Sequence, residues 1–496
     1  MILPAPFVSR RVARMSAVAG MLTWLAACTV GPDFEEPPKP ESQHYDQIAE
    51  NQLSPTSGAQ GVQHISLDRK VDGDWWSVFG SAKLDDVMRR AIEGNLDLAA
   101  ADATISQAAE AVKVAEGGLY PQIDFGAQIA RQRTLYAPPP WTKSLYAIGP
   151  QVSFDLDIFG GTKRLVEQQG ALEDLQKRRF EAAWLTLTGE VASQAFSMAS
   201  ARAQIDAVQL LLADDRKNLG LVRMAHVTGS VTQVDVSLTE NQLAEDETLL
   251  PPLVQQRDAA RHALSVLAGK GPADWVAPDF DLADFKLPPE LPVGLPSELA
   301  QDRPDIRSAE AELHAASAAV GVATANLYPH LTLTASVTQA AAGPGSLFES
   351  GSSLWNIAAG LAGPIFHGGA LEADRRAAID GYKAALANYQ QTVVNSLGQV
   401  ADVLQAIDHD AEAYAAQDRA LAAAQTSLHL SQEGYRRGET GVLQVLDAER
   451  AYERALLGEI RAETARYLDT TQLAVALGGN STGAVTQRVA DRGGGP

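Results

Sequence analysis

The chain contains 496 residues, of which 46% are hydrophobic and 20% charged, and this balance is typical of an ordered protein. Its formal net charge of −21 argues against a nucleic-acid partner and fits a solvated surface or a duct with a negative wall. After the N-terminal segment there is no run of about 18 apolar residues, which excludes a membrane-spanning helix but not strands of about 10 residues with an alternating pattern.

The N-terminal segment has the features of a secretion signal, which we place at residues 1–27. Three arginines between positions 10 and 14 precede a short apolar stretch at residues 15–25, and small residues lead into Cys28. Cys28 is the only cysteine, so the chain can form no disulfide within itself. It is either an incidental residue or the acylated first residue of a mature lipoprotein, and we favour the second interpretation. Thr29, where some lipoproteins have aspartate, resembles the case of sorting to the outer membrane.

An internal repeat of roughly 210 residues organises the rest of the chain and indicates a duplicated half-molecule. Four short segments recur in the same order at nearly constant offset. The pairs are Asn95–Leu98 with Arg303–Ile306, Leu119–Pro121 with Leu327–Pro329, Ile158–Phe159 with Ile365–Phe366, and Thr228–Asp235 with Thr440–Asp447. The predicted organisation is an extended segment at 28–80, a first repeat at 81–269, a proline-rich linker at 270–300, a second repeat at 301–478 and a disordered tail at 479–496.

Four stretches alternate between apolar and polar residues with period two, as strands with one apolar face do. They cover residues 122–129, 151–158, 331–338 and 355–362. Residues 134–144 and 340–352 are the predicted external loops. A soluble sheet with one wet face is the alternative interpretation. The acids Asp124, Asp155 and Asp157 fall on the polar side of the pattern, where we expect them to line a lumen that prefers cations.

A long helical hairpin is predicted after each strand pair. Apolar residues after Gly161 recur at spacings of three, four and seven, which indicates a coiled-coil or bundle stripe, and a matching stretch follows Gly369. We expect the hairpins to turn near Ala199–Ile205 and near Gln405–Ala413. Each helix would then reach roughly 60 Å, too long for a compact domain and too polar for lipid. Projection into the periplasm is therefore expected, with a plain soluble bundle as the alternative.

Four strands cannot close a membrane barrel, because open edges in lipid leave backbone groups unpaired at a cost of several kcal/mol each. Other copies of the chain must therefore complete the sheet. Two copies would give about 8 strands with an interior filled by side chains, and three would give about 12 with room for a lumen. The strand pattern alone leaves both possibilities open.

The mature chain resembles the TolC-like outer-membrane efflux proteins of the lipid-anchored OprM/NodT type. The carrying segments are Leu25–Cys28 with Gly31–Phe34, Trp75–Trp76 with Phe79 and Leu84, Leu295–Ile306 with Ala309–Glu310, Leu327–Pro329, Gly363–Phe366, and Tyr435–Gly438 with Leu446–Asp447. The segment that contains Arg303, Pro304, Asp305 and Ile306 is the most specific of them. Its first-half counterpart begins at Asn95 instead, a divergence between halves.

The resemblance implies an α+β fold in which three copies share a 12-stranded transmembrane β-barrel above a long periplasmic α-helical barrel. It also implies a homotrimer, anchored in the outer membrane through lipid on Cys28. Its partners would be a periplasmic adaptor and an inner-membrane RND-type pump. The implied function is a passive exit duct for small molecules or drugs. Export of proteins, or a periplasmic lipoprotein scaffold without a channel, are the alternatives.

A closed duct needs a gate, and we expect one where the second hairpin turns. Three copies would bring a ring of carboxylates together there, held by cations. The candidates are Asp408, Asp410, Glu412, Tyr414, Asp418 and Arg419, with Arg202 from the first hairpin. No nucleophile, phosphate loop or metal-ligand spacing stands out, so we predict no enzyme activity, cofactor or metal site.

Overall fold

The computed structural model describes residues 29–38, 40, 42, 44–46, 63–67, 73–134 and 141–479. Two compact units divide the chain, and each draws on both halves of the sequence. Unit 1 comprises residues 1–37, 104–176 and 308–390, and unit 2 comprises residues 38–103, 177–307 and 391–496. Cys28 and the tail after residue 479 lie outside the described residues.

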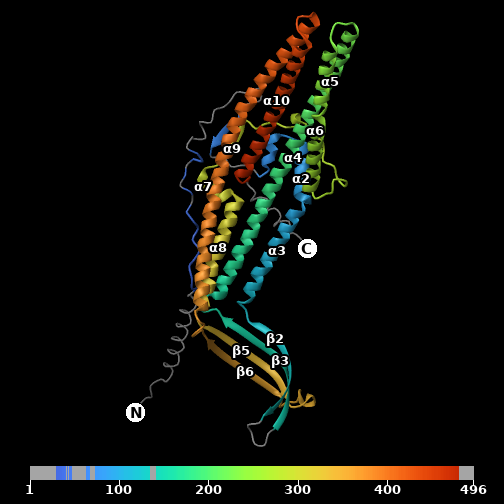
Figure 1. Ribbon diagram of the computed structural model, residues 1–496. Coiled ribbons are helices and arrows are strands. Elements are labelled where there is room, and N and C mark those ends of the chain that lie inside the picture. The colour runs from blue at the N-terminus through green and yellow to red at the C-terminus, as the bar shows by residue number, and fades with distance from the viewer. Residues whose placement is uncertain are drawn as a thin grey trace, which may run out of the picture. The chain divides into compact units, whose positions relative to one another are not determined.

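Unit 1 contains one antiparallel sheet with the strand order β2-β3-β5-β6 (Figure 1). The strands are β2 (Gln122–Thr134), β3 (Trp141–Leu156), β5 (His330–Ala341) and β6 (Ser353–Ala362). Each half contributes one hairpin, and β3 pairs with β5 to join the halves. The four predicted strands are confirmed, but they are longer than expected, since β3 already begins within the predicted loop at 134–144. Within the described residues, β2 and β6 pair on one side only and leave two open edges.

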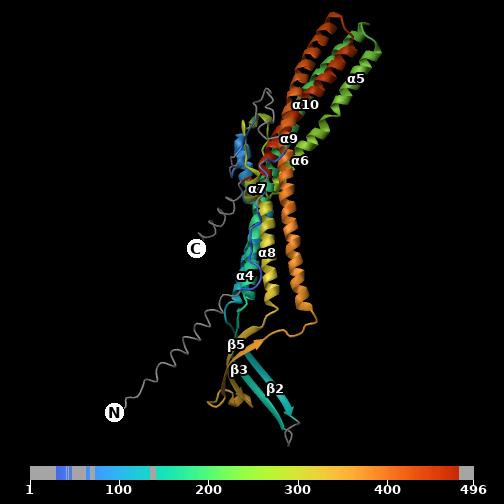
Figure 2. The same ribbon diagram turned by 90° about the vertical axis from the view of Figure 1, so that its left-hand side faces the viewer.

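Helices make up most of the described chain. They are α2 (Ala82–Gly94), α3 (Leu96–Gly117), α4 (Gly161–Val227), α5 (Gln233–Glu247), α6 (Leu250–Leu267), α7 (Pro296–Asp302), α8 (Pro304–Ala325), α9 (Ala370–Arg437) and α10 (Val442–Ala476). None of the helices in the described residues is both long and apolar enough to cross a membrane. In unit 2, α4 and α5 form one hairpin and α9 and α10 form the other (Figure 2).

The hairpins turn much later than the sequence analysis placed them. The predicted turns at Ala199–Ile205 and Gln405–Ala413 are wrong, because both segments lie inside uninterrupted helices, α4 and α9. Neither segment contains a glycine or proline that would end a helix. The helices end instead at Val227 and Arg437, and turns at Gly229 and Gly438 follow, within or beside the repeated Thr-Gly segments.

Both helix ends have the same backbone geometry. Gly229 and Gly438 have φ angles of 72° and 75°, the left-handed conformation that glycine adopts without steric cost. After each glycine the next N–H reaches back five residues: Ser230 donates to the Ala225 carbonyl at 2.9 Å, and Glu439 to the Gly434 carbonyl at 2.8 Å. This pattern satisfies carbonyls that a helix end would otherwise leave unpaired. The long helices of the two halves therefore end in the same type of turn.

The core of unit 2 is aromatic. It includes residues from the predicted extended segment and from the predicted linker. Trp75 and Phe79, from the predicted extended segment, are buried, and Phe79 packs edge-on against Phe196 at 4.9 Å. Residues 270–300, predicted as a linker, contain β4 (Glu290–Val293), which pairs in parallel with β1 (His64–Leu67). Phe285 from the same segment packs on Phe196 at 4.7 Å. The segment between the halves is thus part of the fold.

Candidate functional site

The sheet of unit 1 has one apolar and one polar face. A row of paired residues, Ile123, Val152, Ala335 and Ile357, crosses all four strands on the apolar face. The two isoleucines of this row are exposed in the single chain, and Ile357 is 76% exposed. The other exposed members of this face are Phe125, Ile129, Leu333, Val337, Trp355 and Leu361. A continuous apolar surface of this kind marks a contact with lipid or protein.

The neighbouring row on the opposite face is polar. Asp124 pairs with Gln151, which pairs with Ser336, which in turn pairs with Asn356. Asp155 belongs to the same face, because residues two and four apart on a strand point to the same side. Its carboxylate accepts a hydrogen bond from the Thr332 hydroxyl on the adjacent strand. Two of the three predicted lumen acids therefore share one face.

Asp157 does not lie on a strand, which corrects the third predicted position. Strand β3 ends at Leu156, and Asp157 lies in the turn before α4. Its carboxylate accepts hydrogen bonds from the backbone N–H groups of Thr162 at 3.0 Å and Lys163 at 2.9 Å. These are among the N–H groups that have no partner within a helix. The Asp157 side chain thus caps the N-terminus of α4.

The N-terminal segment just after Cys28 is bound to unit 1 by a buried arginine. The Arg164 side chain is 5% exposed and donates to Asp33 at 2.6 Å, to Glu167 at 2.7 Å and to the Val30 carbonyl at 3.3 Å. Burial opposes the charge of Arg164, yet these two carboxylates raise its pKa. Such paired, hydrogen-bonded burial is the condition under which a charge is stable inside a protein. The sequence analysis did not identify Arg164.

Two further contacts fix the same segment. Phe34 stacks on the His314 ring with centroids 4.3 Å apart. A Cβ on Gly31 would lie 2.5 Å from the Cα of Gly321, so only glycine fits there without displacement of the backbone. The Gly31–Phe34 motif therefore has a local packing role.

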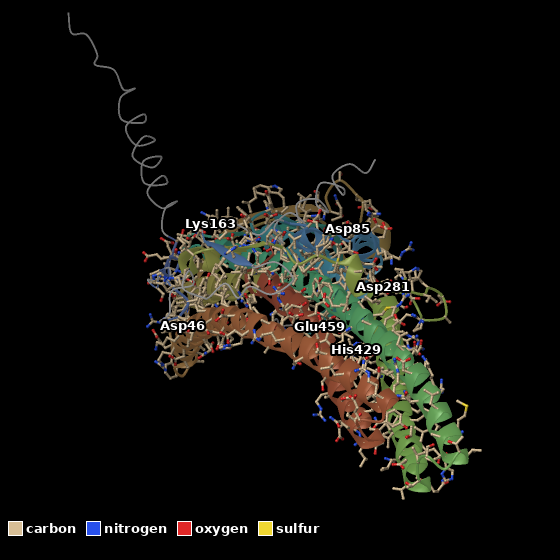
Figure 3. All side chains as sticks on the ribbon, turned by 90° about the horizontal axis from the view of Figure 1, so that it is seen from above. Asp46, Asp85, Lys163, Asp281, His429 and Glu459 are labelled. Carbon is tan, nitrogen blue, oxygen red and sulfur yellow. The ribbon has the colours of Figure 1, made fainter. Side chains whose placement is uncertain are left out.

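The predicted gate residues lie in the middle of a helix. Asp408, Asp410, Glu412, Tyr414, Asp418 and Arg419 all belong to α9. Tyr414 is buried, with the guanidinium carbon of Arg466 5.3 Å from its ring centroid, and it hydrogen-bonds to Glu459, labelled in Figure 3. Asp410 hydrogen-bonds to Asp469. These contacts join α9 to α10 within one chain. The hairpin turn that suggested a gate at these residues is not there, so their role in a gate stays a prediction.

Arg202 is engaged elsewhere. Its side chain forms an ion pair with Asp281 at 3.0 Å and approaches Asp279 at 4.0 Å, in the segment between the halves. Figure 3 labels Asp281. No contact between Arg202 and the α9 acids is recorded among the described residues. The structure therefore does not bring the predicted cation and the predicted carboxylates together.

The ends of the two hairpins enclose a cleft of about 710 Å³. Residues from α4, α5, α9 and α10 line it, among them Asp214, Asn218, Gln432 and Tyr435. The cleft is thus partly polar.

Near the cleft lies a group of acids that the sequence analysis missed. Asp215 occupies a position in an apolar heptad of α4, between Leu212 and Leu219. Glu449 and Glu453 similarly interrupt the apolar stripe of α10. The sequence did contain a signal for these buried acids, because a position within an apolar helix stripe predicts burial whatever residue occupies it.

Comparison with known proteins agrees with this geometry. The sequence model of the outer membrane efflux protein family matches residues 87–270 and 295–479. The chain is 32% identical to the pyoverdine export outer membrane protein OpmQ of Pseudomonas aeruginosa, over 82% of this chain and 87% of that protein. It is 27% identical to the cation efflux system protein CusC of Escherichia coli, over 92% and 97% respectively.

The fold is similar to that of a solved channel. The structure of the Neisseria gonorrhoeae MtrE outer membrane channel in its open state superposes with a TM-score of 0.79 and 26% identity, over 91% of this chain and 98% of that one. The predicted family resemblance and the predicted outer-membrane location are confirmed. The chain is an outer-membrane efflux channel protein and belongs to the outer membrane efflux protein family.

Proposed function

We propose that three copies of the chain close their sheets into one twelve-stranded barrel across the outer membrane, while the long helices form a periplasmic barrel. The observation that carries this proposal is the four-stranded sheet with two open edges and an exposed apolar face. In lipid every backbone N–H and C=O group must find a partner, so other copies have to pair with β2 and β6. Three copies leave space for a lumen, whereas two would fill the interior with side chains.

The two faces of the sheet then have distinct environments. The row that contains Ile357 would face lipid, and the row that contains Asp124 and Asn356 would face the lumen. Asp124 and Asp155 would contribute a negative wall that concentrates cations.

The duct would serve a tripartite system with a periplasmic adaptor and an inner-membrane RND-type pump. Pyoverdine export and cation efflux, the activities in the names of OpmQ and CusC, both concern small solutes. They support solute efflux over protein secretion, and they disfavour a scaffold without a channel. The cleft between the hairpin ends offers a surface for a helical partner. In this proposal the chain conducts passively and performs no chemical step.

A lipid anchor on Cys28 would fit the contacts of the residues that follow it. Val30 and Asp33 are held by Arg164, so the chain beyond residue 28 starts from a fixed point on unit 1. We expect Cys28→Ala to abolish lipid labelling of the mature protein. A mature N-terminus upstream of residue 28 would refute the anchor.

The proposed barrel is tested by two neighbouring substitutions on β6. Lysine at Ile357 would place a charge against lipid, at a cost of about 2–4 kcal/mol per chain near the bilayer midplane. Lysine at Asn356, one residue away and on the other face, would enter the lumen. Ile357→Lys should therefore reduce the heat-sensitive trimer in outer-membrane fractions. Asn356→Lys should assemble and shift the selectivity of single channels in planar bilayers toward anions.

The same measurements separate the alternatives. A wild-type chain that forms no heat-sensitive trimer and conducts no current would support the scaffold. If Ile357→Lys assembles normally while Asn356→Lys does not, the assignment of lipid and lumen faces is reversed.

A further inference from the structure

Four carboxyl groups from three helices of unit 2 lie together in an otherwise apolar helix interface. Asp215 on α4, Asp246 on α5 and Glu449 on α10 are 6%, 7% and 8% exposed, and Glu453 on α10 is partly buried. Apolar clusters flank them on both sides. One contains Leu219, Val222, Val236, Val442 and Leu446, and the other contains Val208, Leu212, Leu457 and Ile460. The acids thus lie in a layer between two hydrophobic clusters.

Some of these carboxylate oxygens have neutral donors. Gln242 donates to both oxygens of Asp246 at 2.9 Å, and Asn218 donates to Oε1 of Glu449. Oδ2 of Asp215 is buried and has no conventional hydrogen-bond donor among the described residues. A buried polar atom without a partner is costly, so this oxygen needs an explanation.

A proton supplies that explanation. The Asp246 carboxyl meets the carboxyls of both Asp215 and Glu453. Ionised carboxylates only accept hydrogen bonds, so two of them in contact repel, whereas a protonated one donates to the other. Each contact therefore holds its helices together only when a proton lies between the two groups.

The charges around the group do not replace that proton. Arg450 on α10 donates to the Gln242 side chain and to Glu245 at 3.2 Å, so its guanidinium is directed to the rim of α5. Arg454 and Arg450 offset part of the charge of Glu453, while Asp214 on α4 adds negative charge near Glu449. From α9 the neutral side chain of Gln432 forms a hydrogen bond to Glu449.

Burial raises the pKa of a carboxyl group, because it disfavours the charged form. It is the largest cause that raises the pKa of Asp215, and the contact with Asp246 raises that pKa further. Burial also raises the pKa of Glu449 to about 7, although Asn218 opposes the change. The group therefore exchanges protons near neutral pH, and the cleft that reaches Asn218 gives it access to water.

The helix that carries Asp246 is the shortest of the three that contribute these acids. Helix α5 spans only Gln233–Glu247, between the turn after Gly229 and a break at Thr248–Leu249. The break precedes Pro251 and Pro252, which lack the N–H groups that would continue the helix ladder. Helix α10 passes the same level without interruption. A change in repulsion at Asp246 would therefore displace α5 first.

We propose that Asp215, Asp246, Glu449 and Glu453 form a proton-controlled clasp, which holds α5 against α4 and α10 when protonated and releases α5 when it ionises. The direction follows from linkage. An acid that binds its proton more tightly in the folded chain favours the folded state at low pH, and this advantage declines as pH rises from its ordinary value toward its native one. Packing of α5 should accordingly weaken between about pH 4 and pH 8. The contacts lie within one chain, so the inference does not depend on the barrel.

The test is hydrogen exchange of α5 amides in the purified full-length protein between pH 5.5 and 8.0, corrected for intrinsic exchange rates. Wild-type protection of α5 relative to α8 should fall by at least about tenfold over this range, since one proton per opening gives tenfold per pH unit. Asp215→Asn provides a neutral donor to Asp246 at every pH and should reduce the decline, while the contact between Asp246 and Glu453 accounts for the remainder. Asp214→Asn, its exposed neighbour, removes only a nearby charge and should retain most of the decline.

Glu449→Gln is the second variant, and it should reduce the decline if Asp215→Asn does not fold. Constant protection of α5 in the wild type across the pH range would overturn the proposal. An undiminished decline in folded Asp215→Asn or Glu449→Gln would also overturn it, because the pH dependence would then come from other groups.

Discussion

The two halves of the chain are closed by equivalent junctions with different chemistry. In the first half, Asn95 before α3 donates to the Leu267 carbonyl at the end of α6 at 3.0 Å. In the second half, Arg303 before α8 donates to the Ala476 carbonyl at the end of α10 at 2.7 Å. A neutral amide and a guanidinium therefore perform the same task, which is to tie the start of one helix to the end of the helix that returns from the hairpin.

The difference lies in what else each side chain must bind. Asn95 also accepts a hydrogen bond from the Leu98 N–H at 2.9 Å and so caps its own helix. Arg303 is buried and charged, and it binds Asp305 through two nitrogens at 2.9 and 2.6 Å, and Gln399 on α9 at 2.8 Å. The buried guanidinium of Arg303 requires the Asp305 carboxylate as a partner. Arg303 thereby joins three helices, whereas the amide of Asn95 joins two.

The largest effect is expected from Arg303→Ala. The substitution removes the bond to Ala476 and leaves Asp305 without its cation, and breaking a fully buried pair typically costs about 3–5 kcal/mol. Because the Asp305 side chain is 42% exposed, we expect about 2–4 kcal/mol of unfolding free energy. Urea unfolding of the purified protein followed by circular dichroism measures it. Arg303→Lys should recover only part of the loss, since an amine cannot bind both carboxylate oxygens in the same fork.

Asn95→Ala should cost less, about 1–2 kcal/mol. It deletes a helix cap and leaves the Leu267 carbonyl without this donor, but it strands no charge. The same urea titration provides the comparison. If Asn95→Ala lowers the unfolding free energy as much as Arg303→Ala does, the charge of Arg303 makes no difference to the stability of its junction.

The repeat itself was readable from the sequence, but the equivalence of these two junctions was not. The alignment of Asn95 with Arg303 looked like divergence, because residue type does not reveal a shared carbonyl partner roughly 170 residues further along. The strands were predictable for the opposite reason: alternation is a local signal, and the residues that pair across β2 and β3 lie close in sequence.

The hairpin turns and the candidate sites show the same limit. The repeated Thr-Gly segments were recognised as anchors, yet the long helices continue until just before them, and a length estimate placed the turns some 30 residues too early. The acids of α9 were chosen on that basis and lie in mid-helix. Asp215, a buried acid in an apolar stripe, carried a signal that only a heptad count would have found.

The smallest expected effect is a loss of hydrogen-exchange protection at low pH that affects the second junction but not the first. Burial opposes ionisation of Asp305, but the hydrogen bond and charge of Arg303 outweigh it and lower the pKa of Asp305 below its ordinary value of 3.8. An acid whose pKa is lowered by folding stabilises the protein above its ordinary pKa, and this contribution is lost as pH falls through the native value. We therefore expect protection of the first amides of α8 to fall below about pH 4. The corresponding amides of α3, capped by the neutral Asn95, serve as the internal reference. Asp305→Asn should abolish the additional response of α8, and a response of α8 that persists in this variant would assign it to another carboxyl group.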